Sequence, residues 1–181
     1  MACGRRNYFP LFVTGLRGDS SSLVMKTNTE NFSAPRLNFR TVPSATLQAM
    51  FGLQKAVNES GLEPALLELV KMRASQINGC AFCLDMHYRD ARKAGESEQR
   101  LYLLSAWRES PGYTARERAA LHWTEVLTTV AGKGVSDEDF AEARGQFSEA
   151  ELAYLTLAIV AINGWNRINV GFRTPPGFVT T

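Results

Sequence analysis

The sequence has few of the features that mark a secreted, membrane-spanning or nucleic-acid-binding protein. It contains only three cysteines, too few for the disulfide framework of a small secreted domain. No apolar run approaches the ~18 residues that a membrane span requires. A formal net charge of +2 gives no electrostatic reason to expect binding to nucleic acid or to an anionic membrane. These absences predict a cytoplasmic protein in a reducing compartment.

The positions at which helical periodicity begins and ends predict one domain with a flanking segment on each side. Residues 1–38 show no sustained helical or strand periodicity. We therefore predict that they form a poorly ordered N-terminal arm, or an extension upstream of a natural translation start at Met25. A transit peptide is an alternative, because no acidic residue precedes Asp19. We predict that residues 39–173 form a single helical domain, which is large enough to bury a core, and that residues 174–181 form a C-terminal tail.

From Pro43 onward, the sequence predicts consecutive helices. Apolar residues recur at helical spacing, and no segment alternates as a half-buried strand would. The helix that begins at Ser97 is expected to continue to Trp107. The expected helix starts carry capping serines or threonines, or a proline suited to the first turn: Ser44, Pro64, Ser97, Thr114, Ser136 and Ser148. Two of them form capping boxes, Thr114 with Glu117 and Ser148 with Glu151. We therefore predict an all-α fold.

Two segments of the helical region resemble each other. Residues 65–79 and 150–164 align without gaps, and both end in Ile-Asn-Gly. A duplicated helical hairpin would explain the alignment, and so would a chance match between two apolar helices.

The most distinctive stretch of the sequence is Cys80-x-x-Cys83-x-x-x-His87. If Gly79 ends one helix and Cys80 begins the next, the two cysteines lie one turn apart on one face. Side chains at that spacing have Cβ atoms roughly 5–6 Å apart, which a modest adjustment brings to disulfide geometry. His87 lies one turn beyond Cys83, so its imidazole can assist Cys83 directly and Cys80 only poorly. The spacing predicts a redox dithiol with its own base.

A reactive Cys83 requires a lowered thiol pKa. A free thiol has a pKa of about 8.5, which a helix N-terminus and a neighbouring imidazole can lower to roughly 3.5–7.5. The Cys83 thiolate would then attack an electrophile such as a peroxide oxygen and become a sulfenic acid. Cys80, one turn away, would condense with the sulfenic acid to form a disulfide. This interpretation requires neither a metal nor a cofactor.

Two other interpretations of the same residues remain open. Cys80, Cys83 and His87 could bind zinc, with His122 or Glu68 as the fourth ligand, in a zinc-stapled helical interaction protein without turnover. The two cysteines could also be an inert buried pair. His122 by itself is interpreted as a structural or surface histidine.

A longer pattern resembles a known family. Glu68, eleven intervening residues and then Cys80-x-x-Cys83-x-x-x-His87 resemble the signature of the alkylhydroperoxidase D–like branch of the carboxymuconolactone decarboxylase family, over residues 39–172. The resemblance implies an all-α fold that assembles into trimers or hexamers and reduces small-molecule hydroperoxides. It also implies that Cys83 attacks the peroxide, that Cys80 resolves the sulfenic acid, and that His87 and Glu68 belong to a proton relay.

The chain departs from that family between the two cysteines. Alkylhydroperoxidase D enzymes carry a histidine at the position of Phe82. The expected electron donor is a dithiol, such as a lipoyl- or thioredoxin-like reductant. The decarboxylase branch lacks the cysteine pair, so lactone decarboxylation is the weaker enzymatic alternative. We predict an antioxidant thiol peroxidase or disulfide oxidoreductase that acts as a homo-oligomer.

Three tryptophans and two neighbouring apolar residues are assigned to packing. Trp107, Trp123 and Trp165 are expected to anchor the core or an interface, and not to read a substrate. Some of Met50, Phe51, Trp107 and Trp165 are expected to be buried between subunits.

Overall fold

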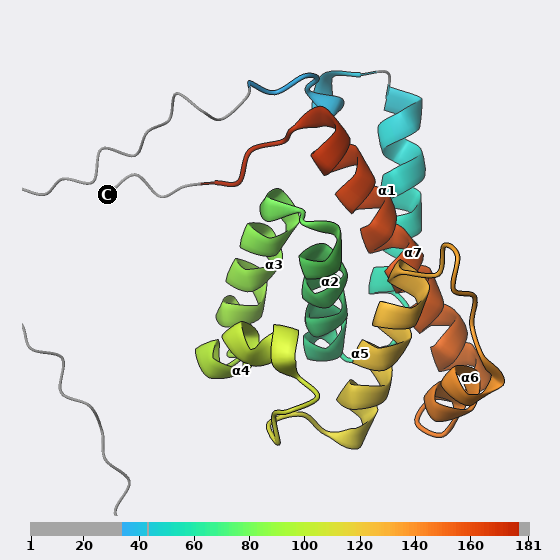
Figure 1. Cartoon of the computed structure of the whole chain (residues 1–181). Helices are drawn as coiled ribbons and strands as arrows, with labels where there is room; N and C mark the ends of the chain where they lie inside the picture. Colours follow the sequence, from blue (N-terminus) through green and yellow to red (C-terminus); the bar gives the residue numbers. More distant parts are fainter. Residues whose placement is uncertain (1–33, 43, 178–181) are drawn as a thin grey trace, which may run out of the picture. The chain divides into compact units, whose positions relative to one another are not determined.

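The structure is a computed structural model in which residues 34–42 and 44–177 are described (Figure 1). Residues 1–33 of the predicted N-terminal arm and residues 178–181 of the predicted tail lie outside the described residues. The side chain of Ser44, expected as a helix cap, also lies outside them.

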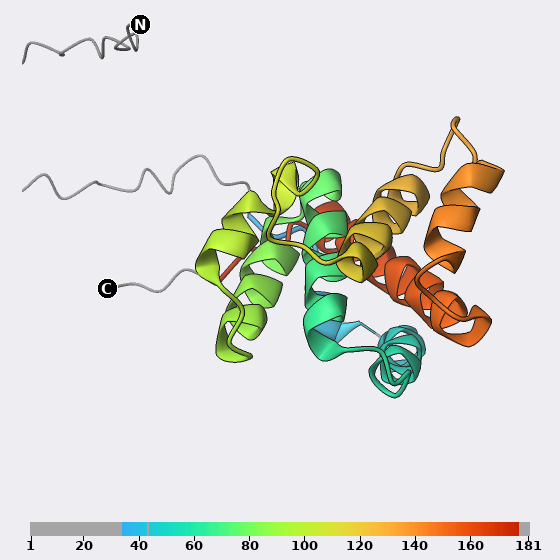
Figure 2. The same ribbon diagram turned by 90° about the horizontal axis from the view of Figure 1, so that it is seen from below.

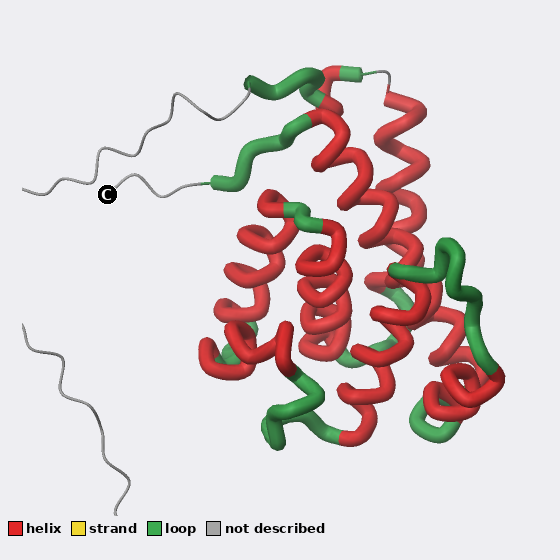
Figure 3. The backbone as a smooth tube through the Cα atoms, viewed as in Figure 1, coloured by secondary structure: helices red, strands yellow, loops and turns green. Residues whose placement is uncertain are grey.

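The described residues form helices joined by turns and short loops, without a strand (Figure 3). This confirms the predicted all-α fold class. In chain order the elements are η2 (Phe39–Thr41), α1 (Ser44–Asn58), α2 (Pro64–Asn78), α3 (Ala81–Lys93), α4 (Glu98–Leu103), η3 (Leu104–Ala106), α5 (Ala115–Thr128), α6 (Asp137–Arg144) and α7 (Glu149–Phe172). None of these helices is long and apolar enough to cross a membrane.

Local side-chain signals start most of these helices as the sequence predicts. Pro64 occupies the first turn of α2, where its missing N–H costs no helical hydrogen bond. Both predicted capping boxes are present at the starts of α5 and α7, and Ser136 with Asp139 forms a third at the start of α6. In each box the cap hydroxyl accepts from a backbone N–H while the acidic side chain accepts from the N–H of the cap residue.

The helix predicted from Ser97 to Trp107 is shorter than expected. Helix α4 ends at Leu103 and tightens into η3, which ends at Ala106. Arg118 of α5 donates to the carbonyl oxygens of Trp107, Arg108 and Ser110 at 2.9–3.0 Å. These side-chain bonds satisfy carbonyls that a continued helix would have used, so the chain can turn here.

Of the two explanations left open for the internal alignment, a second hairpin is not observed. Helix α7 continues through Gly164, whereas Gly79 adopts the left-handed conformation that ends α2. Gly164 lies inside this continuous helix and against α1, since a Cβ at position 164 would lie 3.1 Å from Cε of Met50.

Helix α2 lies at the centre of the domain. It packs against α3, α5 and α7, and Figures 1 and 2 show α3 on one side of it and α5 and α7 on the other. Its consecutive residues Leu69 and Val70 are both completely buried, because each belongs to a different hydrophobic cluster. Each such side chain contributes roughly 1.5–3 kcal/mol of burial free energy. The central position of α2 fixes where the first turn of α3 lies.

A chain of buried amides connects the end of α2 to the middle of α7. The Asn78 side-chain NH2 donates to the side-chain oxygens of Asn163 and Asn166, both at 2.9 Å. The Asn166 amide in turn donates to the Ser75 hydroxyl at 2.9 Å. Asn166 is completely buried, so its polar atoms rely on these protein partners.

We predict that Asn166→Ala destabilises the fold by about 1–3 kcal/mol, because it removes the hydrogen bonds that Asn166 makes with Asn78 and Ser75 from a completely buried position. The free energy of unfolding from urea denaturation measures the loss. Glu149→Ala is the control on α7, since the Glu149 side chain is 90% exposed, and it should change stability by no more than about 0.5 kcal/mol. Equal losses for the two variants would contradict a structural role for the amide chain.

Candidate active site

The cysteine pair begins directly after the turn between α2 and α3. Gly79 has φ 64°, and the backbone N–H groups of Gly79 and Cys80 donate to the carbonyls of Gln76 and Ser75. This pair of bonds is a Schellman motif, which ends α2 and reverses the chain. Cys80 is the N-cap of α3, and Cys83 lies within its first turn. The expected placement of the two cysteines on one helix end is thus observed.

Both cysteines are unlinked and almost completely buried, with exposed fractions of 1% for Cys80 and 0% for Cys83. They pack with Ala74 and Ile162 in a small hydrophobic cluster. They differ in what they face: Cys83 lines the large pocket of the domain and Cys80 does not. Only Cys83 is therefore presented to a bound small molecule.

The two thiols shift each other's pKa in opposite directions. Hydrogen bonding from the Cys83 thiol, helped by the backbone N–H groups of Cys83 and Phe82, lowers the pKa of Cys80 to about 7. The same contact with Cys80, together with burial, raises the pKa of Cys83. We expected the helix N-terminus to lower the pKa of Cys83, but that effect falls on Cys80, the cap residue. The directions of the two pKa shifts favour the thiolate on Cys80 over the thiolate on Cys83.

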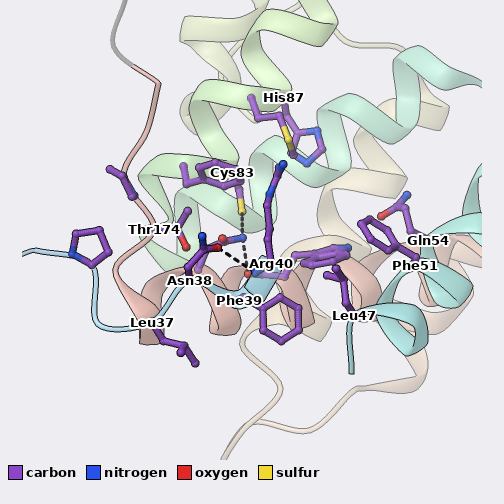
Figure 4. A pocket seen from close by; sticks show the side chains of 16 residues that line it. Leu37, Asn38, Phe39, Arg40, Leu47, Phe51, Gln54, Cys83, His87 and Thr174 are labelled. Atoms are coloured by element: carbon purple, nitrogen blue, oxygen red, sulfur yellow. Dashed lines mark hydrogen bonds between the residues drawn. The ribbon is translucent and has the colours of Figure 1, made fainter. Parts of the chain in front are cut away.

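An asparagine of α7 contacts the sulfur of Cys83. The Asn169 side-chain NH2 donates to Cys83 Sγ at 3.5 Å and to the backbone carbonyl of Trp165 at 2.9 Å (Figure 4). The contact lowers the pKa of Cys83, although less than burial and Cys80 raise it. Sequence reasoning missed Asn169. The available signal was the spacing of Asn163, Asn166 and Asn169, which puts three amides along one side of an otherwise apolar helix.

The structure brings Glu68 of α2 and His87 of α3 into contact. Oε2 of Glu68 lies 2.8 Å from Nδ1 of His87, and Oε1 accepts from Nζ of Lys71 at 2.8 Å. His87 is only 8% exposed. Burial favours a raised pKa for Glu68, but its hydrogen bond with His87 and the charges of His87 and Lys71 outweigh burial and lower that pKa.

This contact fixes the tautomer of the imidazole. An ionised Glu68 can only accept hydrogen bonds, so Nδ1 of His87 must carry the proton. In the neutral ring, Nε2 is then the unprotonated nitrogen, and His87 lines the same pocket as Cys83. The pair therefore presents a base whose orientation is set by a carboxylate.

The pocket in front of Cys83 has a volume of about 670 Å3, a size typical of small-molecule sites. Its walls come from the segment before α1, from α1, α3 and the end of α7, and from the residues after α7 (Figure 4). Most of them are apolar. The lining residues are Pro35, Leu37, Asn38, Phe39, Arg40, Leu47, Phe51, Gln54, Phe82, Cys83, Met86, His87, Trp165, Asn169, Thr174 and Pro175.

The tryptophans divide between core and pocket. Trp107 and Trp123 are 4% and 6% exposed and belong to the hydrophobic core, as predicted. Trp107 is thus already buried within its own subunit, so it is not one of the residues that could be buried between subunits. Trp165 lies on the pocket wall, against the rings of Phe39 and Phe51. Trp165 also packs against the small hydrophobic cluster around the cysteines, so it is half-buried between that cluster and the pocket.

The residues proposed as zinc ligands do not converge. His122 of α5 bonds Asp139 of α6 at 2.7 Å and Arg108 at 3.0 Å, and it lines a smaller, separate pocket. Glu68 is engaged by His87 and Lys71. Over residues 34–42 and 44–177, no three side chains of His, Cys, Asp or Glu are grouped as metal ligands. His122 thus links α5 to α6 through Asp139, which is a structural contact.

Comparison with known proteins identifies the family. The model of the carboxymuconolactone decarboxylase family matches residues 44–126. The uncharacterized protein YdfG of Bacillus subtilis (strain 168) is 41% identical over 135 residues, which are 75% of this chain and 92% of YdfG.

Solved structures share the fold. A protein of unknown function from Agrobacterium tumefaciens, with a suggested identity as the antioxidant defence protein AhpD, is 45% identical with a TM-score of 0.78, over 81% of this chain and 100% of that one. The debrominase Bmp8 without ligand shares the fold at 21% identity, with a TM-score of 0.67 over 74% of this chain and 72% of Bmp8. The chain belongs to the carboxymuconolactone decarboxylase family and has its alkylhydroperoxidase D–like helical fold, as the Glu68–Cys80–Cys83–His87 pattern predicted.

Proposed function

We propose that this protein is a thiol peroxidase that reduces hydroperoxides through a dithiol/disulfide cycle of Cys83 and Cys80. The observation that carries the proposal is the position of Cys83: it lines a pocket together with His87, whose tautomer is set by Glu68. The second thiol lies one helical turn away. The suggested antioxidant role of the Agrobacterium tumefaciens protein, at 45% identity, supports the same activity.

Because Cys83 lines the pocket and Cys80 does not, we propose Cys83 as the attacking residue, although Cys80 has the lower pKa. In this proposal the Cys83 proton passes to the Cys80 thiolate or to Nε2 of His87, which lines the same pocket. Transfer to either one leaves a thiolate at Cys83, where the side-chain NH2 of Asn169 stabilises the charge. Cys80, which does not line the pocket, is suited to the second step.

The proposed cycle balances atoms and electrons in three steps. The Cys83 thiolate attacks the terminal oxygen of ROOH, so that the S–O bond forms, the O–O bond breaks, and protonated His87 gives its proton to the leaving alkoxide as ROH. Cys80 then attacks the sulfenic acid sulfur, which forms the disulfide and releases hydroxide that is protonated to water. A dithiol reductant, such as a lipoyl- or thioredoxin-like carrier, returns two electrons and two protons and leaves as its own disulfide.

The two cysteines should respond differently to replacement. With peroxide and no reductant, the wild-type protein should form a Cys80–Cys83 disulfide that excludes Cys3, which lies outside the described residues. Cys83→Ser should form no sulfenic acid. Cys80→Ser should form a sulfenic acid at Cys83 that persists or over-oxidises, because no second thiol resolves it. Dimedone trapping with peptide mapping measures these states.

Cys3→Ser is the control and should cycle as the wild type does. A sulfenic acid that appears on Cys80 in Cys83→Ser, and never on Cys83 in Cys80→Ser, would reverse the two roles. Free thiols at both positions after peroxide treatment would refute the cycle itself.

Loss of the base should slow the oxidation step and leave the fold intact. His87→Ala should reduce the rate of Cys83 oxidation by roughly 10²–10⁴-fold, the range for a positioned base. Glu68→Gln should also slow it, because an amide can donate to Nδ1 and so favour a proton on Nε2. Stopped-flow oxidation by cumene hydroperoxide measures the rates. Asp85→Asn replaces another carboxylate close by, outside the pocket lining, and should keep the wild-type rate. A wild-type rate in Glu68→Gln would remove Glu68 from the relay.

We also propose that the chain assembles into a trimer or hexamer, as its family resemblance implies. Large apolar side chains on α1 and α7 remain exposed in the single chain, including Phe51 at 56% and Val160 at 54%. Burial of such side chains between subunits would stabilise an oligomer. Light scattering at micromolar concentration should therefore give a trimer or hexamer, and a monodisperse monomer would contradict the proposal.

A further inference from the structure

The pocket in front of Cys83 is larger and more apolar than hydrogen peroxide requires. Phe39, Phe51, Phe82 and Trp165 contribute aromatic walls to a volume of about 670 Å3. A ligand must be of comparable size and apolar over most of its surface to displace water from these rings favourably. Two oxygen atoms at Cys83 would leave the walls unused. The pocket composition therefore favours an organic hydroperoxide with a long or bulky apolar body.

The permanent charge among the residues that line the pocket is positive. Arg40 carries the permanent positive charge of the pocket, and no aspartate or glutamate is among the lining residues. Glu68 stands behind His87, with its charge engaged by His87 and Lys71. Within the described part of the chain, the guanidinium of Arg40 has no ion pair and no side-chain hydrogen bond. Figure 4 shows its side chain extending from η2 toward the wall that carries Cys83 and His87.

The segment that carries Arg40 is held in place by the end of α7. Arg36 donates from its backbone N–H to the carbonyl of Phe172 at 2.9 Å and from Nη1 to the carbonyl of Gly171 at 3.2 Å. The ring of Phe39 stacks on Phe172, with centroids 6.1 Å apart. Asn38 caps η2 by accepting from the backbone N–H of Arg40 at 3.0 Å. These contacts fix the backbone from which Arg40 enters the pocket.

We propose that the substrate is an amphipathic hydroperoxide with a carboxylate, such as an oxidised fatty acid, and that Arg40 binds the carboxylate. This inference rests on the proposed peroxidase function and names its substrate class. The planar fork of a guanidinium matches a carboxylate in a bidentate pair, which is the strong form of a charge-assisted hydrogen bond. The apolar body lies against the aromatic walls, and the peroxide reaches Sγ of Cys83. Arg40 is thus a specificity-determining residue of the site.

The test compares an acid with its neutral ester. Turnover of the hydroperoxide of linoleic acid, of its methyl ester and of cumene hydroperoxide is measured with dithiothreitol as the dithiol. Arg40→Gln should lower kcat/KM for the acid about 10–100-fold, the cost of losing hydrogen bonds to a charged group. The ester and cumene hydroperoxide should change less than about twofold, since neither carries a charge for Arg40 to bind. Arg40→Lys should restore part of the loss, because it keeps the charge without the fork.

A matched control separates this effect from net charge. Arg173→Gln removes the same charge at the C-cap of α7 but does not alter the pocket lining, so it should leave all three substrates unchanged. Equal kcat/KM values for acid and ester in the wild type would overturn the inference while the peroxidase function stands. An equal loss for acid and ester in Arg40→Gln would also overturn it, because the variant would then act on the pocket as a whole.

Binding of unoxidised linoleic acid distinguishes failure of the inference from failure of the peroxidase function. Calorimetry on the Cys80→Ser variant should give saturable binding that Arg40→Gln weakens about 10–100-fold. If no hydroperoxide is turned over, the proposed function fails, and an Arg40-dependent affinity for the acid still supports the assigned ligand class. Absence of saturable binding, or an affinity that Arg40→Gln leaves unchanged, overturns the inference.

Discussion

The left-handed turn at Gly79 is the constraint on which the site depends. Its φ of 64° suits glycine, because an L-residue in this conformation brings its Cβ close to the following carbonyl oxygen, at a cost of roughly 1–2 kcal/mol. The turn folds α3 back along α2, so that Glu68, before the turn, meets His87, after it. It also makes Cys80 the cap of α3, where the Cys83 thiol and free backbone N–H groups lower its pKa. One backbone conformation thus orients the base and places the negative charge.

Helix α7 completes the site from a distant part of the chain. Asn163 and Asn166 hold the end of α2 through Asn78, and Asn169, one turn further on, reaches the sulfur of Cys83. Buried amides of this kind cost free energy unless every donor and acceptor is paired. Since pairing is possible in one register of α2 against α7, the amides fix that register. The same contacts that specify the packing therefore place Asn169 at the thiol.

The sequence was sufficient for features that depend on neighbouring residues. Capping boxes, the end of α2 at Gly79 and the shared face of the two cysteines follow from spacing within one or two turns. Features that join distant elements were not accessible in this way, because Asn169 and Arg40 reach the pocket from segments far from Cys83 in the chain. Gly164 illustrates the limit. It follows the same Ile-Asn pair as Gly79, but Met50 packs against it and the helix continues. The same Ile-Asn-Gly pattern therefore occurs both at a helix end and inside a helix.

The division of labour between the thiols links reactivity to pocket occupancy. The directions of the two pKa shifts favour the charge on Cys80, which does not line the pocket, over the pocket-facing Cys83. A thiolate exposed in an open pocket would react with any small oxidant, whereas a protonated thiol does not. Moving the charge to Cys83 costs free energy because burial opposes it, and the hydrogen bond from Asn169 offsets part of that cost. A bound apolar substrate excludes water, and exclusion of water strengthens that hydrogen bond. In the proposed cycle, a substrate that fills the pocket therefore helps to create the nucleophile that attacks it.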